Sequence, residues 1–149
     1  MTTPGPGGPP VLALAVGAGA EALAASTGPH RAVDRLRVLG DADDAGAVLD
    51  VELPRLTTGW RVLAVGTGRD VRAVRAAALA RGALDEEVTT WAVGADSGTD
   101  VRVHCGACHQ WFDARAGEQR PCPGCGVALV VTDHDSRTHG AVLGAPRVP

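Results

Sequence analysis

The sequence predicts an α/β protein in which a small domain with a parallel β-sheet precedes a module folded around a metal ion. One observation is the order strand, glycine turn, helix and strand over residues 61–93, which is typical of a βαβ unit. The other is that all four cysteines lie in two Cys-x-x-Cys motifs. We therefore expect a disordered Pro/Gly-rich leader over 1–10, an α/β domain over 11–96, and a metal-binding module with a C-terminal docking tail over 97–145.

The first half of the α/β domain contains shorter signals. Residues 11–16 are an apolar run typical of a buried strand, and a glycine turn separates them from a short helix over 21–25. Residues 35–39 alternate in polarity, as an edge strand does. The aspartates at 41–44 are suited to cap a short helix over 45–49.

The second half gives the clearest prediction. Residues 61–65 are a buried strand followed by a Gly-Thr-Gly turn. We expect Asp70 to cap the next helix, which runs to Arg81 and ends at Gly82. Residues 87–93 form the following strand, so an open parallel sheet is expected.

Composition disfavours several functional classes. The net charge is −3 and the isoelectric point about 5.9, whereas a nucleic-acid-binding domain needs a basic face. No apolar run approaches the roughly 18 residues of a membrane span. The start of the chain lacks the charged and apolar regions of a secretory signal. We expect a cytoplasmic protein that binds neither membranes nor nucleic acids.

The spacing of the cysteines predicts a Cys₄ metal site. Cys105, Cys108, Cys122 and Cys125 form two hooks with 13 residues (109–121) between them, and small residues within the hooks allow backbone N–H groups to approach the sulfurs. Zinc is the expected ion. Iron is the alternative, because Cys-Pro-Gly-Cys hooks also occur in rubredoxin, although there the two hooks lie further apart. A pair of disulfides is disfavoured in a cytoplasmic setting.

The residues around the hooks predict a zinc ribbon. Residues 101–104 lead into the first hook as a strand, and 127–131 leave the second hook as another. The following residues, 133–144, form a polar tail without clear periodicity. We expect His134, Ser136 and Arg137 in this tail to contact a partner chain. A second metal site at His134 and His139 is disfavoured, because a spacing of five fits neither a helix nor a strand.

The glycine turns have two interpretations. A Gly-x-Gly turn before a helix could bind a phosphate, but the turn at 66–68 lacks the third glycine of the dinucleotide motif, and Asp70 would repel an anion. A tight turn without a ligand is therefore favoured. Residues 62–88 resemble the nicotinamide-binding half of ferredoxin–NADP reductase-like flavoproteins, which implies a half-Rossmann domain. Val65 stands where that family has its cysteine, so the cofactor site is expected to be lost.

The C-terminal third resembles a second family. The two Cys-x-x-Cys hooks, Cys-Pro-Gly-Cys-Gly at 122–126, the residues 129–131, 133–134 and 136–137, and Gly-Ala-Val-Leu-Gly at 140–144 are similar to the small subunit of bacterial dimethylamine monooxygenase, the DmmA-like family. Asp135 replaces an expected aromatic residue, and Thr138 replaces an expected basic one.

This resemblance implies a structural or regulatory zinc-binding subunit of a multi-component, haem-dependent amine monooxygenase. Oxygenase and reductase subunits would carry the haem, FMN and [2Fe–2S] groups, and no catalytic residue is expected on this chain. The alternatives are a rubredoxin-like iron electron carrier and a generic zinc-ribbon protein-interaction module.

Overall fold

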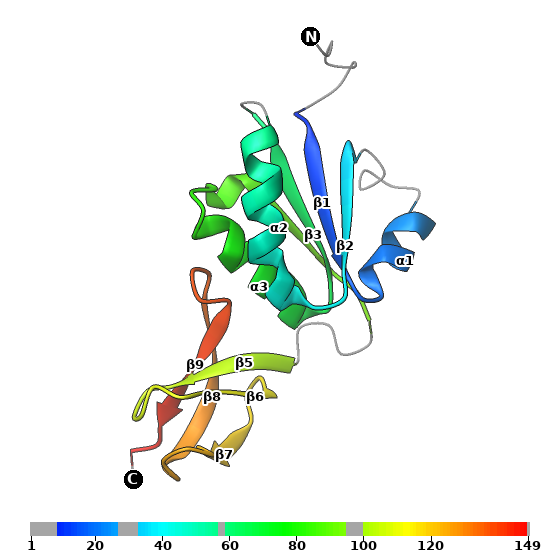
Figure 1. The fold of residues 1–149 in the computed structure, drawn as a ribbon. Coiled ribbons are helices and arrows are strands. Elements are labelled where there is room, and N and C mark those ends of the chain that lie inside the picture. Colours follow the sequence, from blue (N-terminus) through cyan, green and yellow to red (C-terminus); the bar gives the residue numbers. More distant parts are fainter. Residues whose placement is uncertain (1–8, 27–32, 57–58, 95–99, 149) are drawn as a thin grey trace.

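Two β-sheets form the framework of the protein. The computed structural model describes residues 9–26, 33–56, 59–94 and 100–148, and within these ranges the chain forms a four-stranded sheet followed by a five-stranded one (Figure 1). We call residues 9–94 the parallel-sheet part and residues 100–148 the C-terminal part. The predicted mixed α/β class with a parallel sheet is confirmed. The predicted boundary at 96–97 and most of the leader lie outside the described residues.

The first sheet is entirely parallel, as predicted. Its strands are β1 (Val11–Val16), β2 (Arg35–Leu39), β3 (Arg61–Gly66) and β4 (Val88–Ala92), in the order β2-β1-β3-β4. The central strands β1 and β3 are apolar because both of their faces are buried. In the edge strand β2 the exposed residues are Leu36 and Val38. The half-buried positions are Arg35 and Arg37, which pair with the buried carboxylate of Glu52.

Helices cover both faces of this sheet (Figure 1). The helix α1 (Gly19–Ala25) packs through Leu23 on one face, where Ala13, Ala15, Leu63 and Val65 are buried. The helices α2 (Ala45–Glu52) and α3 (Gly68–Leu79) cover the opposite face and supply Leu49, Val71 and Val74 to a larger core. The described residues of this part also contain short 3₁₀ turns at Ala42–Asp44, Leu53–Arg55 and Asp85–Glu87.

The helix α3 begins earlier than predicted. Thr67, not Asp70, is the N-cap residue, because Gly68 already has helical geometry. The Thr67 hydroxyl accepts the N–H of Asp70 at 3.2 Å, and the Asp70 carboxylate accepts the N–H of Thr67 at 3.2 Å. Asp70 therefore closes a capping box from the third helical position. The helix ends at Leu79, and Gly82 turns the chain away at φ +90°.

The C-terminal part is a five-stranded mixed sheet. It contains β5 (Asp100–Cys105), β6 (Trp111–Arg115), β7 (Gln119–Pro121), β8 (Ala128–Ser136) and β9 (Ala141–Pro146), in the order β6-β5-β9-β8-β7. β5 and β6 form one antiparallel hairpin, and β7 and β8 form another. β9 lies between the hairpins, parallel to β5 and antiparallel to β8. The last strand therefore joins the two hairpins.

The prediction of an irregular tail over 133–144 was wrong. β8 extends to Ser136, and β9 begins at Ala141. The pairing of β8 with β9 shifts register between Val131 and Asp135, so the side chains do not alternate there as in a regular strand. Gly144 and Pro146 also make β9 resemble a loop in sequence. Gly144 is required by packing, since a Cβ atom there would lie 2.9 Å from a methyl carbon of Val103.

The turn between β8 and β9 packs against helix α3. A Cβ atom at Gly140 would lie 2.8 Å from the carbonyl oxygen of Arg72, so only glycine allows this approach, and its φ of +63° also favours glycine. Ion pairs surround the contact, with Arg69 3.3 Å from Asp113 and Arg72 4.0 Å from Asp135. These pairs are partly exposed, so they orient the two parts more than they stabilise them. No helix in the described ranges is long and apolar enough to cross a membrane.

Candidate metal centre

The two cysteine hooks lie at corresponding positions in the two hairpins of the C-terminal part. Cys105 is the last residue of β5, and its hook turns the chain into β6. The second hook lies between β7 and β8. Because β9 pairs with both β5 and β8, it brings these two turns together. The fold therefore assembles a cluster from cysteines that are up to 20 residues apart in the sequence.

The four sulfur atoms have the spacing of a tetrahedral metal site. Sγ of Cys105 lies 3.9 Å from that of Cys125, and Sγ of Cys108 lies 3.7 Å from that of Cys122. All four sulfurs lie within 4.8 Å of one another. Metal–sulfur bonds of about 2.3 Å in a tetrahedron place the sulfurs about 3.8 Å apart, so the arrangement fits a single ion. The cysteines are free thiols in this arrangement, not disulfides.

Backbone N–H groups are directed at the sulfurs, as the small residues in the hooks predict. Ala107 and Cys108 donate to Sγ of Cys105 at 3.4 and 3.5 Å. Gly124 donates to Sγ of Cys122 at 3.3 Å. Such donors stabilise the negative charge of a thiolate, which is the form that binds a metal. The two hooks therefore supply both the ligands and part of the charge compensation.

The surroundings of the cluster shift the pKa values of Cys122 and Cys108 in opposite directions. The N–H groups of Cys125 and Gly124 lower the pKa of Cys122 to about 6, against the effect of burial. The N–H of Gln110 favours the thiolate of Cys108, but burial and the three neighbouring sulfurs outweigh it and raise the pKa of Cys108 to about 12. At neutral pH the lowered pKa favours the thiolate of Cys122, and the raised pKa disfavours the thiolate of Cys108.

A small apolar core packs against the cysteine cluster. Leu129 is fully buried together with Cys105 and Cys122, and Phe112 packs against them. A second cluster, centred on Val103 and Val131, continues this core along the sheet. Cys125 lies on the outside and is exposed. The cysteine cluster is therefore one end of the core of the C-terminal part and not a separate surface feature.

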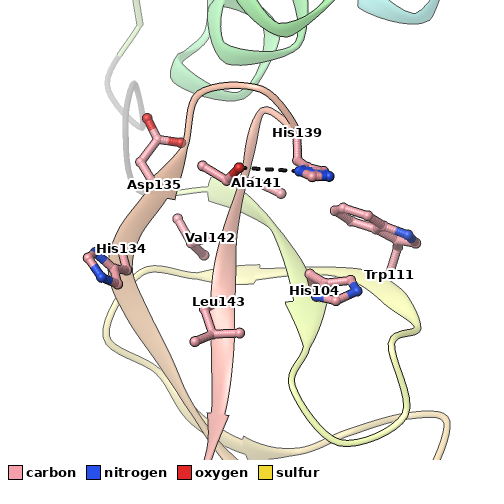
Figure 2. A pocket seen from close by; sticks show the side chains of 9 residues that line it. His104, Trp111, His134, Asp135, His139, Ala141, Val142 and Leu143 are labelled. Atoms are coloured by element: carbon pink, nitrogen blue, oxygen red, sulfur yellow. Dashed lines mark hydrogen bonds between the residues drawn. The ribbon is translucent and has the colours of Figure 1, made fainter.

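His104, Trp111 and His139 of the C-terminal part form a chain of ring contacts. His104 and Trp111 flank the first hook and are paired across β5 and β6, with ring centroids 4.7 Å apart. His139, from the turn between β8 and β9, stacks on Trp111 at 5.9 Å. Together with β9 these rings form one wall of a pocket of about 330 Å³ (Figure 2). This pocket was not predicted from the sequence, although the position of His104 and Trp111 on either side of the first hook indicates that they pair across a hairpin.

The residues predicted to contact a partner lie in two places. His134 and Ser136 line the pocket, with His134 across β9 from Trp111 (Figure 2). Arg137 forms an ion pair with Asp85 of the parallel-sheet part. Asp135, which replaces the expected aromatic residue, faces Arg72. His134 and His139 line the same pocket, but they do not join a metal-ligand cluster among the described residues. The docking role of the three residues stays a prediction.

A known protein family matches the C-terminal part in sequence. Residues 102–145 match the family described as the dimethylamine monooxygenase subunit DmmA-like, C-terminal domain. The matched range includes all four cysteines, strands β6 to β8 and most of β5 and β9. The family description names a subunit of a monooxygenase. No curated protein matches the chain. Residues 102–145 of this chain are therefore similar to the C-terminal domain of the DmmA-like family.

Proposed function

We propose that this protein is a structural or regulatory zinc-binding subunit of a multi-component, haem-dependent amine monooxygenase of the dimethylamine type. The observation that carries the proposal is a four-sulfur site with tetrahedral spacing inside a domain of the DmmA-like family. Haem, FMN and the [2Fe–2S] cluster would be held by oxygenase and reductase subunits, in the cytoplasm. This chain would contribute a rigid docking element and no catalytic group.

The position of the metal site supports a structural role. Each hook ends or begins a hairpin, so an ion bound by all four sulfurs would clamp the two hairpins at the same end at which β9 joins them. In such small modules the free energy of metal binding stabilises the fold. We therefore interpret residues 97–145 as a zinc-ribbon module whose shape depends on the ion.

The parallel-sheet part would act as a support for this module. Its half-Rossmann, ferredoxin-reductase-like interpretation rests on the sheet order and on the β3–α3 unit. In open parallel sheets, nucleotides bind at the carboxyl ends of the strands. Here, residues of that edge line a cavity of about 160 Å³ together with Arg102, His139 and Gly140 of the C-terminal part. This arrangement supports the view that residues 11–96 have lost the cofactor site.

Iron is the specific alternative to zinc. A rubredoxin-like iron site also has four thiolates, N–H donors to sulfur and aromatic neighbours, and Phe112 packs against this cluster. The sulfur geometry fits both ions. An iron-containing chain would act as an electron-transfer component of the same complex. Iron–thiolate sites absorb visible light and zinc sites do not, so colour separates the two proposals.

The first experiment is metal analysis with a visible spectrum, on the chain purified alone and together with its partner subunits. One zinc per chain and a colourless isolated subunit are expected. Cys125→Ser removes an exposed ligand with little change in packing and is expected to lower the metal content and unfold the C-terminal part. Ala107→Ser is the matched control, because Ala107 is an exposed hook residue that is not a ligand. An unchanged metal content and melting temperature for Cys125→Ser would contradict the assignment.

A further inference from the structure

One face of the C-terminal sheet is turned away from its core. Along β5, Val101 and Val103 are buried, whereas Arg102 between them is exposed. The strand register aligns His104 with Trp111 of β6 on one side and with Leu143 of β9 on the other. This row of three residues crosses three strands on the outward face. Trp111 is 42% exposed and Leu143 is 39% exposed, so two large apolar side chains in the row contact solvent.

The parallel-sheet part already covers the neighbouring section of the same face. Arg102 is aligned with Asp113 in the hairpin, and Asp113 pairs with Arg69 of α3. The turn that carries His139 and Gly140 contacts α3 directly. The exposed row therefore continues an interface that the chain makes with itself. A partner that binds the row would extend this interface instead of creating a separate one.

The row borders a concave site, whose lining residues are drawn in Figure 2. His104, Trp111 and His139 lie on one side of β9, and His134 and Asp135 lie on the other (Figure 2). Ala141, Val142 and Leu143 lie between them and make the floor apolar. The volume of about 330 Å³ is large enough for one bulky side chain. Polar groups, including the hydroxyl of Ser136, lie around this apolar floor.

Arg102 gives the site a charge preference. Its guanidinium lies 5.3 Å from the centroid of the Trp111 ring, so the cation and the aromatic ring hold each other in place. Within the described ranges, Arg102 makes no ion pair with a carboxylate. By contrast, the carboxylate of Asp135 faces Arg72. Asp41, Asp43 and Asp70 line the cavity of about 160 Å³ on the other side of Arg102, but none of them forms an ion pair with it. Among the side chains that the structure describes, Arg102 is therefore a positioned cation without a carboxylate partner, next to an apolar pocket.

We infer that this site, made of Arg102, His104, Trp111, His139 and Leu143 with the pocket beside them, is the surface on which a partner subunit docks. The partner segment inserts one large apolar side chain above Leu143 and places a carboxylate against Arg102. Tryptophan and arginine dominate the binding energy of many protein interfaces, and here they are already stacked on each other. The inference rests on the proposed function, since it takes a subunit of the monooxygenase as the partner.

The test measures binding of the purified oxygenase and reductase subunits of the same monooxygenase to the metal-loaded chain. Trp111→Ala is expected to weaken binding of one subunit by about 30-fold or more, the usual effect of truncating a central interface residue. Arg102→Glu is expected to weaken it by about tenfold and to remove much of its salt dependence. Arg55→Glu is the matched control, because it makes the same charge change at an exposed position of the parallel-sheet part.

A second measurement keeps the native side chain in the site. In a Trp60→Phe, Trp91→Phe background, Trp111 is the only tryptophan, and its fluorescence is expected to shift to shorter wavelength when the partner covers it. If a subunit binds but Trp111→Ala binds equally well and the fluorescence does not shift, the docking surface is wrong and the proposed function stands. If neither subunit binds the unmodified chain, the proposed function itself fails. Binding of a small molecule alone in the pocket, without either subunit, would also overturn the inference.

Discussion

Leu129 connects the strength of metal binding to the packing of the C-terminal sheet. It is fully buried, it packs with Cys105 and Cys122, and one of its methyl carbons would lie 3.1 Å from a Cβ atom at Gly144. Replacement of a buried leucine by alanine costs about 2–5 kcal/mol, and more when the cavity cannot collapse. Here a bound ion would fix two walls of the cavity through their sulfurs. We therefore expect Leu129→Ala to cost about 4 kcal/mol in the metal-bound protein.

This cost should be measurable as a loss of metal affinity, although Leu129 is not a ligand. If the C-terminal part folds only with its ion, the free energy of folding is included in the apparent binding free energy. A loss of about 4 kcal/mol corresponds to about 1,000-fold weaker binding. The assay is competition for the metal with a coloured chelator at fixed pH, together with urea unfolding of the loaded protein. Val127→Ala is the control, because Val127 is 36% exposed and lies just before β8.

Two results would refute this reasoning. If Leu129→Ala binds metal as tightly as the unmodified chain but unfolds at lower urea concentration, the two hooks form a site that does not require the sheet. If both measurements are unchanged, the residue does not pack as the structure shows. A loss of affinity of similar size in Val127→Ala would mean that the assay reports general disturbance of the second hook.

Three further predictions concern both parts of the chain. Gly19→Ala is expected to lower the free energy of unfolding of the parallel-sheet part by about 3 kcal/mol in urea titrations, because the new Cβ atom would lie 2.3 Å from the carbonyl oxygen of Val65. The metal content should not change, and an unaltered unfolding midpoint would contradict the contact. Glu52→Gln is expected to lower the free energy of unfolding by about 2 kcal/mol in the same assay, because the buried carboxylate accepts a hydrogen bond from Nε of Arg37 at 2.8 Å. An unchanged free energy would show that the ion pair only offsets the cost of its own desolvation. Metal uptake at pH 7 is expected to release about three protons per ion, as measured with a pH indicator, because a pKa of about 6 leaves Cys122 mostly ionised whereas an ordinary thiol is protonated there. As the pH falls below about 6, Cys122 also becomes protonated and metal affinity decreases further. Release of all four protons at pH 7 would contradict the lowered pKa.

The parts of the fold that could be predicted from sequence are those fixed by local chemistry. The apolar runs of β1 and β3 indicated strands buried on both faces, and the structure places both in the centre of the sheet. The spacing of the cysteines indicated one four-ligand site, and their sulfurs meet. In both cases the signal depends on neighbours within one strand or one turn. Asp70 shows the limit of such signals, because Thr67 three residues earlier is an equally good cap and Gly68 is able to start the helix.

The parts that could not be predicted depend on contacts between distant segments. β9 contains Gly144 and Pro146, which disfavour a strand by local propensity, yet it fills the position between β5 and β8. The pocket lined by His104, Trp111 and His134 combines β5, β6, β8 and β9, so it could not be recognised until the order of the strands was known. Arg137 was expected to face a partner, and its ion pair with Asp85 depends on how the two parts of the chain meet.

The central position of β9 also determines when the metal can be enclosed during synthesis. All four cysteines precede β9 in the chain, so a growing polypeptide exposes both hooks to solvent before the strand that aligns them has been made. Until residues 141–146 insert between β5 and β8, the two hairpins have no shared strand that holds the hooks side by side. An ion that is bound before β9 has been made would have to align the hooks by itself, so we expect the tightest binding only after β9 has been translated.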